Sequence, residues 1–391
     1  MSPPSTPTIA SPEGRLLLAC ARTPLEPEHK QRLRELAATP LDWELLLQAA
    51  ELHGLEPLLC WNLAENAAEV APAVVVERLK VRFARHARSN LLLAGELLRI
   101  LHGLEAAGIP ALPYKGPALA AGLYGDLSLR EFSDLDILVE SGHVPAARDL
   151  LLAAGYRPQI ELSAQQQSAY LRSGCELGFV GREGAVVVEV HWRIAPRHFA
   201  TEPAVDEFLR RAQPARLGEE QVRTLCREDL LLVLALHAGK HLWRGLGWIC
   251  DVAQLLRRSP DLDWGAVEQR AGALGLRRLV HLPLHLAREL LDAPLAAGPA
   301  AAIDADAELQ LLAREVLQRP LVESVGTEWS VADHRFFLRA RERRRDRMRY
   351  LLRLAVTPGA AEWQSVRLPA FLFPLYPAVR LARLAGKGMR P

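Results

Sequence analysis

The sequence predicts an α+β fold in which a small mixed sheet lies between two helical regions. Apolar residues recur at helical spacing through most of 15–94 and 201–330, whereas strand-type runs gather within 95–200. A chain of 391 residues is long enough for two or three domains. We therefore expect a disordered tail over 1–14, three central regions at these boundaries, and a basic helix with an apolar tail over 331–391.

Composition excludes several classes of protein. The net charge of +2 is too small to predict nucleic-acid binding over the whole surface. The five cysteines form no CxxC pair, which argues against a structural zinc site or a disulfide scaffold and favours a reducing cytoplasm. Residues 1–14 are rich in proline and serine, unlike a signal peptide, and no apolar run approaches the ~20 residues that span a bilayer. We expect a cytoplasmic protein.

The sheet region opens with a helix, a short strand and a turn. Leucines and an isoleucine at helical spacing over 93–104 predict a helix that ends near Gly108, and residues 109–114, with two prolines, predict a short or edge strand. Lys115-Gly116-Pro117 then leads into a helical run. Gly116 permits close approach of a ligand to the backbone, and Lys115 adds a positive charge, so the turn could bind an anion. A plain strand–turn–helix junction is the alternative.

An acidic pair follows in a strand-type run. Side chains two residues apart in a strand share a face, so Asp134 and Asp136 lie together while Leu135, Ile137 and Val139 fill the core on the other face. Two carboxylates this close repel each other by about 4 kcal/mol at an effective dielectric of 20. A hard cation such as Mg²⁺ relieves that repulsion and commonly bridges carboxylates to substrate phosphates. Chance occurrence of Asp-x-Asp is the alternative interpretation.

Arg130 lies in the polar loop 125–132, four residues before Asp134. Its guanidinium could bind a phosphate through two hydrogen bonds or could neutralise the aspartates. The sequence leaves both roles open.

A second pair of strands is expected at 175–181 and 185–192, joined by the turn Arg182-Glu183-Gly184. Glu189 interrupts a strongly β-forming run and shares a face with His191. A lone glutamate there is costly unless it has a partner. If this strand lies beside the Asp134–Asp136 strand, Glu189 becomes a third carboxylate at the metal site. A solvated glutamate on an edge strand is the alternative.

These motifs together resemble the nucleotidyltransferase superfamily with the DNA polymerase β-like fold. The resemblance rests on Lys115-Gly116-Pro117, Asp134-Leu135-Asp136 and Glu189 in that order, and covers roughly 15–385. The residues of these motifs are most similar to those of a bacterial group of uncharacterised nucleotidyltransferases. The resembling stretches are Tyr114-Lys115-Gly116, Arg130 with Ser133 to Val139, Glu189 to Arg193, and Leu236 to Trp243 with Trp248 and Asp251.

The resemblance implies a nucleotidyltransferase core over 95–200 that uses Mg²⁺ or Mn²⁺ and a nucleoside triphosphate. By this resemblance Asp134, Asp136 and Glu189 are catalytic residues and metal ligands. The residues expected to bind nucleotide or phosphate are Lys115, Gly116, Arg130, Ser133 and Lys240. Those expected to contact substrate are His191, His237, His241 and Asp251. The chain departs from the usual Gly-Gly or Gly-Ser turn at Gly116-Pro117, and the interval from Gly116 to Asp134 is longer than usual.

Residues 229–243 predict a long apolar helix on which His237, Lys240 and His241 share one face. No glutamate follows His237, so the HExxH zinc motif is absent. Two interpretations remain open: a face that binds nucleotide phosphates or the acceptor, with Lys240 on the triphosphate by analogy, or a helix end with partly buried histidines.

Two C-terminal features have simple interpretations. Eight arginines over 339–353, opposed by Glu342 and Asp346, are typical of a solvated helix face, with a phosphate- or nucleic-acid-binding surface as the alternative. The apolar segment 368–377 precedes Arg380, Arg383, Lys387 and Arg390. It is expected to pack on the body of the protein, with peripheral membrane contact as the alternative.

The resulting hypothesis is a Mg²⁺-dependent nucleotidyltransferase that acts on an unidentified acceptor, which could be a small molecule, sugar, peptide, protein or, less favoured, nucleic acid. Two alternatives are kept: a non-catalytic nucleotide-binding or partner protein on the same fold, and a metal-dependent phosphohydrolase.

Overall fold

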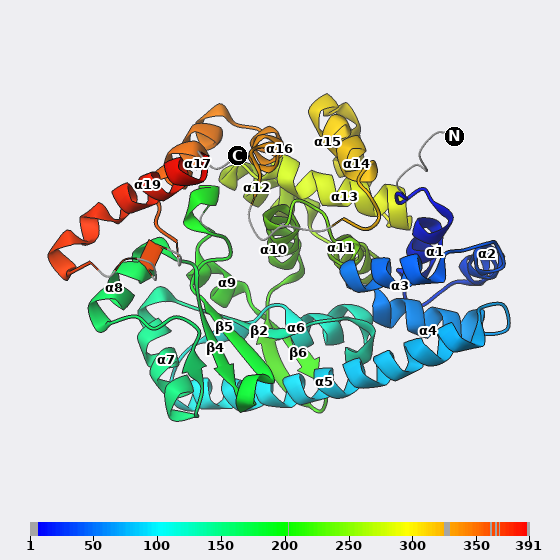
Figure 1. Cartoon of the computed structure of the whole chain (residues 1–391), viewed down its shortest axis with the longest axis horizontal. Helices are drawn as coiled ribbons and strands as arrows, with labels where there is room; N and C mark the ends of the chain where they lie inside the picture. Colours follow the sequence, from blue (N-terminus) through cyan, green and yellow to red (C-terminus); the bar gives the residue numbers. More distant parts are fainter. Residues whose placement is uncertain are drawn as a thin grey trace.

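The computed structural model describes residues 7–201, 203–323, 329–359, 362–363, 366 and 368–388. Figure 1 shows helices α1–α4 at one end of the molecule and the sheet near the lower edge. The long helix α5 passes beneath both, and the later helices lie above them. The N-terminal helices are α1 (Pro12–Cys20), α2 (Pro27–Ala37), α3 (Trp43–Leu52), α4 (Glu56–Asn66) and α5 (Ala73–Ala106). Helix α5 runs across the boundary expected at 94/95, because its apolar face packs against both regions.

The main sheet is mixed, as expected from the sequence. Its five strands are β1 (Ala111–Pro113), β2 (Asp134–Val139), β3 (Arg157–Pro158), β4 (Glu176–Gly181) and β5 (Val186–His191), in the order β1-β2-β5-β4-β3. Strands β2 and β5 are parallel, whereas the other neighbours are antiparallel. The helices inserted between these strands are α6 (Gly116–Leu119) with a π-turn (Ala120–Tyr124), α7 (Val144–Ala153) and α8 (Ala164–Ser173).

The two faces of β2 differ as the alternation of the sequence predicts. Leu135, Ile137 and Val139 are fully buried in one cluster with apolar residues of α5 and α7. The opposite face carries Asp134 and Asp136. The hydrophobic side therefore anchors the strand, and the acidic side stays available for chemistry.

The region after the sheet contains a strand pair as well as helices. Helix α9 (Val205–Arg211) leads into the hairpin β6 (Gln213–Leu217) and β7 (Glu220–Thr224), which the helical pattern of the sequence did not predict. The helices that follow are α10 (Arg227–Lys240), α11 (Leu246–Arg258), α12 (Trp264–Leu274), α13 (Arg277–Leu291), α14 (Ala297–Ala305) and α15 (Ala307–Leu317). Apolar residues of α10, α11 and α13 share one core with those of α1–α4. No helix in the described part of the chain is long and apolar enough to cross a membrane.

The arginine-rich segment is split between α16 (Val331–Ala340) and α17 (Arg344–Val356). Arg345 and Arg349 are exposed, as a solvated face requires. Arg341 is fully buried and donates to Thr201 Oγ1 over 2.9 Å, so the solvated-face interpretation is wrong for that residue. A buried arginine keeps its charge and needs polar partners, and here Thr201 and Asp346 supply them.

The chain ends beside α17. A 3₁₀ segment (Ala370–Leu375) leads into α19 (Tyr376–Gly388), where the buried Tyr376 hydroxyl donates to the carbonyl of Val366 over 2.8 Å. Trp363 and Tyr376 belong to the same hydrophobic cluster as residues of α5 and α7, and Arg380 Nε donates to the carbonyl of Leu354 on α17 over 2.7 Å, so this segment packs on the body as expected. At the other end, residues 1–6 of the expected tail and Arg390 lie outside the described residues. Residues 7–14 are not separate from the fold, because α1 starts at Pro12 and Leu321 N–H donates to the Pro7 carbonyl over 2.7 Å.

Candidate functional site

The parallel pairing of β2 with β5 brings the predicted carboxylates together. Asp136 is the register partner of Glu189, and Leu138 is the partner of His191. Neighbouring strands lie about 4.8 Å apart, so side chains at partner positions on one face are in reach of each other. Glu189 is expected from the sequence to be a third carboxylate of the site if its strand lies beside the Asp134–Asp136 strand. The two strands are neighbours in the structure, so this condition is met.

Asp136 is the centre of a network of ion pairs. Its Oδ1 lies 2.7 Å from Lys115 Nζ and 2.9 Å from His191 Nε2, and the carboxylate is almost fully buried. Burial opposes ionisation, but the two cations outweigh it and hold the pKa of Asp136 well below its usual range. Burial also disfavours charge on His191, but Asp136 and Glu189 raise the pKa of this imidazole to about 9. The site is thus strongly polarised around one carboxylate.

Asp134 differs from Asp136 because it forms no ion pair with a cation among the described residues, although Lys115 and His191 partly oppose the rise of its pKa. Its carboxyl is partly buried at the start of β2, and burial together with the negative charge of Asp136 raises its pKa to about 6. The pKa values of the two acids are therefore shifted in opposite directions. In such an arrangement one carboxyl, here Asp136, stays ionised while the other, Asp134, exchanges protons near neutral pH.

Gly116 shapes the turn that carries Lys115. Its φ is +54°, a conformation that glycine adopts without strain, and a Cβ at this position would lie 3.1 Å from the carbonyl oxygen of Asp134. The backbone of the turn thus passes close over the start of β2. This approach brings the Lys115 side chain onto the acidic face.

Three side chains form a group with the spacing of a metal site. One ligand atom from each of Asp136, Glu189 and His191 lies within 4.8 Å of the other two. Two carboxylates and an imidazole are a donor set that suits a divalent ion. These residues fit a divalent cation. The expected ligand Asp134 is not in this group, and His191, expected to contact substrate, is.

Glu176 at the start of β4 is a site residue that the sequence analysis missed. It is the register partner of His191, with its Oε2 3.3 Å from His191 Nδ1 and 3.9 Å from Lys240 Nζ. The signal was incomplete, since pairing the two predicted strands outward from their turn aligns Glu176 with Val190. In the structure Gly181 pairs with Val186, which shifts the register by one residue and places Glu176 opposite His191. Glu176 thus links the end of α10 to the sheet. Burial disfavours the charged form of Lys240, but the negative charge of Glu176 outweighs this effect, so the pKa of Lys240 is raised.

His237 on α10 and His241, the residue that follows this helix, form an aromatic group with Trp248 of α11. The His241 ring stacks on Trp248 with centroids 4.3 Å apart, and the His237 ring meets Trp248 edge-on at 5.4 Å. Burial lowers the pKa of His241 to about 4 and that of His237 well below its usual value, so both rings are neutral at pH 7. This agrees with partly buried histidines at a helix end, and leaves Lys240 as the charged member of the face.

Arg130 has a partner that the local sequence did not suggest. Its Nε and Nη2 donate to the two carboxylate oxygens of Asp251 on α11, over 2.8 and 2.9 Å, and the Tyr124 hydroxyl donates to the same carboxylate. Arg130 therefore neutralises Asp251 and not Asp134 or Asp136. The pair holds the loop before β2 against α11, and Ser133 in that loop is exposed.

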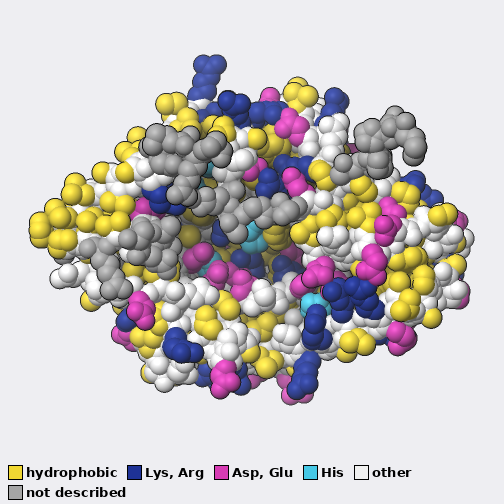
Figure 2. All heavy atoms as spheres, in the orientation of Figure 1, with side chains coloured by type: hydrophobic (Ala, Val, Ile, Leu, Met, Phe, Trp, Pro, Cys, Tyr) yellow, Lys and Arg dark blue, Asp and Glu magenta, His cyan; other side chains and the backbone are white. Residues whose placement is uncertain are grey.

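Charged side chains gather where this face of the molecule is hollowed. Figure 2 shows acidic, basic and histidine side chains around a depression near the centre of the view.

Comparison with known proteins gives one result that bears on this geometry. The model of a family described as "Uncharacterised nucleotidyltransferase" matches residues 39–292, which include the whole acidic face and α10–α11. A comparison with curated proteins gave no match.

Proposed function

The chain belongs to the uncharacterised nucleotidyltransferase family, and we propose that it transfers a nucleoside monophosphate from a nucleoside triphosphate to an acceptor with the help of a divalent cation. The observation that carries this proposal is the register pairing of Asp136 with Glu189 on adjacent parallel strands, beside two lysines. Acids that cluster with cations on one face of a sheet are suited to a charged substrate such as a triphosphate.

In this proposal Asp136, Glu189 and His191 hold the cation, with Asp134 at the edge of the same face. A bound divalent cation would supply charge stabilisation for the phosphates in the displacement. Lys115 beside Asp136 and Lys240 beside Glu176 offset the charge of the phosphate oxygens. Gly116 lets the phosphates approach the backbone. We assign no phosphate contact to Arg130, because it is already paired with Asp251. We assign none to the exposed Ser133 either.

The reaction is written with the acceptor oxygen as nucleophile. A new bond forms between this oxygen and the α-phosphorus, and the bond from the α-phosphorus to the bridging oxygen of the β-phosphate breaks. Pyrophosphate leaves with the bonding electrons. The proton of the acceptor hydroxyl passes to a carboxylate, for which Asp134 is suited because its pKa is raised to about 6 by burial and by Asp136.

The test is equilibrium binding of ATP, GTP, CTP and UTP by calorimetry with Mg²⁺ or Mn²⁺. We expect metal-dependent binding of at least one nucleotide, weakened more than about 100-fold in Asp136→Asn, since loss of groups that merely support a ligand already costs 10–100-fold. The matched control is Asp149→Asn on α7, an exposed aspartate whose salt bridge is to its neighbour Arg148. Equal binding by Asp136→Asn and wild type would refute the site.

Product analysis separates the alternatives. Pyrophosphate release that depends on an acceptor supports transfer, whereas free monophosphate that appears without a labelled acceptor supports a phosphohydrolase. Nucleotide binding with neither product supports a non-catalytic nucleotide-binding protein.

A further inference from the structure

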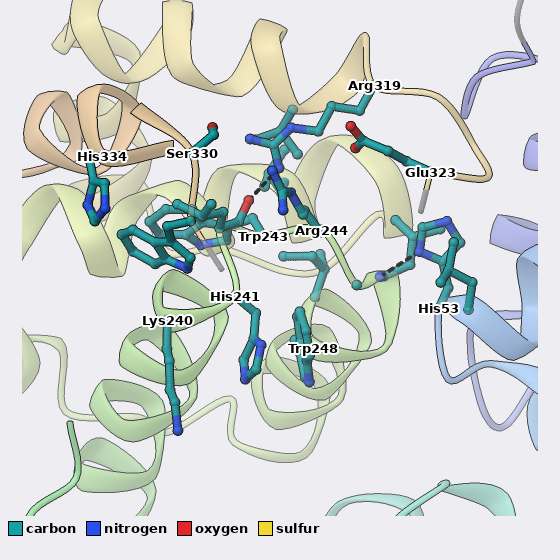
Figure 3. A pocket seen from close by; sticks show the side chains of 18 of the residues that line it. His53, Lys240, His241, Trp243, Arg244, Trp248, Arg319, Glu323, Ser330 and His334 are labelled. Carbon is teal, nitrogen blue, oxygen red and sulfur yellow. Dashed lines mark hydrogen bonds between the residues drawn. The ribbon is translucent and has the colours of Figure 1, made fainter. Parts of the chain in front are cut away.

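A pocket of about 1070 Å³ opens beside the acidic face and shares Lys240 with it. Its walls come from the α10–α11 turn, from the segments that flank α15 and α16, and from α17 and α19. Figure 3 shows Lys240 extending to one end of the view and Arg244 and Arg319 side by side at the other, with His241 and Trp248 on the wall. Lys240 Nζ lies 3.9 Å from Glu176 of the acidic face, so a molecule in this pocket would border the nucleotide site.

The end of the pocket farthest from Lys240 carries the guanidinium groups of Arg244 and Arg319, with Glu323 as the acidic residue of the described lining there. Arg244 pairs with Asp333 over 2.6 Å, whereas the guanidinium of Arg319 donates to the carbonyl of Leu242 and lies 5.0 Å from the Phe336 ring centre. In the described residues Arg319 forms no ion pair with a carboxylate. Burial and the nearby charge of Arg244 lower the pKa of Arg319 to about 10, so it is still a cation at pH 7. Two adjacent guanidinium groups repel unless an anion lies between them.

Two residues of the wall carry buried donors without acceptors in the described part of the chain. Arg244 Nε and Trp243 Nε1 are buried and have no hydrogen-bond partner among the described residues. Both are donors, and a buried donor without an acceptor costs about 1–3 kcal/mol.

The rest of the wall is apolar and aromatic. Its large aromatic members are Phe199, Trp243, Trp248 and Trp329. Pockets that combine such walls with a few placed charges bind organic molecules and not simple ions. Inorganic phosphate alone would leave most of this surface uncovered.

We propose that this pocket binds the second substrate, the acceptor, and that the acceptor is an organic anion with an apolar body whose carboxylate or phosphate lies at Arg319 and Arg244. This inference rests on the proposed function, because the bound molecule is an acceptor only if the protein transfers a nucleotidyl group. The shared residue Lys240 places the uncharged end of such a molecule next to the acidic face, where a hydroxyl could meet the α-phosphate.

The test uses two aromatic probes of the same shape, 2-naphthoate and the neutral 2-naphthamide, with binding followed by calorimetry. We expect naphthoate to bind the wild type at least about tenfold more tightly, since a charge-assisted hydrogen bond contributes about 1.5–3 kcal/mol. Arg319→Met should abolish this preference. Arg314→Met, an exposed arginine in the last turn of α15, should retain it.

Further measurements keep the inference falsifiable. If Arg319→Met fails to fold, Arg319→Lys keeps the charge and should keep the preference, and added NaCl should weaken naphthoate binding alone. Equal affinity of the two probes for the wild type overturns the proposal, as does an undiminished preference in Arg319→Met. Nucleotide binding by the wild type separates the two proposals: a wild type that prefers naphthoate but binds no nucleotide contradicts only the transferase.

Discussion

Asp136 and Glu189 lie at directly paired positions on two parallel strands, although 52 residues separate them in the chain (189 minus 136, less one). His191, the next residue on the same face of β5, reaches back to Asp136 over 2.9 Å. The candidate metal group therefore depends on one strand pairing, and a shift of that register by one residue would turn Glu189 and His191 to the opposite face.

The imidazole in this group predicts a preference among metals. Carboxylates suit Mg²⁺ and Mn²⁺ alike, whereas imidazole favours transition metals. We expect the wild type to bind Mn²⁺ at least about tenfold more tightly than Mg²⁺, and His191→Gln to reduce that ratio. Electron paramagnetic resonance of free Mn²⁺, with Mg²⁺ as competitor, measures both affinities. His102→Gln, on an exposed part of α5, is the control, and an unchanged ratio in His191→Gln would exclude His191 as a ligand.

Gly116 should not tolerate a side chain. Gly116→Ala forces alanine to φ +54° and brings its Cβ to 3.1 Å from the Asp134 carbonyl, so we expect a loss of about 1–3 kcal/mol of unfolding free energy and weaker nucleotide binding. Urea denaturation measures the first effect. Gly122→Ala is the matched control, because a Cβ there meets nothing within 4 Å and the residue is not at positive φ. Equal stability of the two variants would contradict the argument.

The Arg130–Asp251 pair should be essential for stability. Both side chains are largely buried, so Arg130→Met leaves an uncompensated carboxylate and should cost about 3–5 kcal/mol of unfolding free energy. The double variant Arg130→Met/Asp251→Leu should cost less than the sum of the two single variants, since it removes both charges. Arg227→Ala, which breaks the exposed pair with Asp261, should cost less than about 1 kcal/mol. Strict additivity in the double variant would show that the pair is not coupled.

Glu96 on α5 should make stability depend on acid pH. Burial opposes its ionisation, but Arg99, Tyr156 and Arg182 lower its pKa to about 2. A carboxyl whose pKa is depressed by folding stabilises the fold above its unfolded pKa, near 4.3, and loses that contribution as pH falls to 2.

We therefore expect Glu96→Gln to lower the unfolding free energy by about 2 kcal/mol at pH 7, a value discounted for the exposed parts of both arginines. The deficit should shrink between pH 4.5 and 2, as measured by urea denaturation across that range. Glu105→Gln, exposed on the same helix, should show no such trend.

Much of the sheet could be predicted because its signals are local. The alternation of apolar and acidic residues along 134–139 predicted the buried and acidic faces of β2. The turn over Arg182–Gly184 predicted the β4–β5 hairpin. The helix bearing Lys240 followed from its apolar spacing. The mixed character of the sheet was also predicted and is confirmed.

The remaining features depend on contacts between distant parts of the chain. The partner of Arg130 lies 121 residues away on α11, so a local view offered only the nearby aspartates. The β6–β7 hairpin was missed because its strands are mostly polar and exposed, and they lack the apolar alternation that marks a half-buried strand. Arg341 was taken for a surface residue because the burial of a charged side chain is decided by its surroundings, here Thr201 and Asp346.

The shared core of the N-terminal and later helices has a consequence for synthesis of the protein. His53, after α3, contacts the carbonyl of Leu321, 268 residues further along the chain, and α1 packs against α13. Helices α1–α4 therefore emerge from the ribosome long before the surfaces that cover them. At 5–20 residues per second that interval lasts roughly 13–55 seconds. During it the leucine-rich faces of these helices are open to chaperones, and the N-terminal region completes its packing only when the last third of the chain has been made.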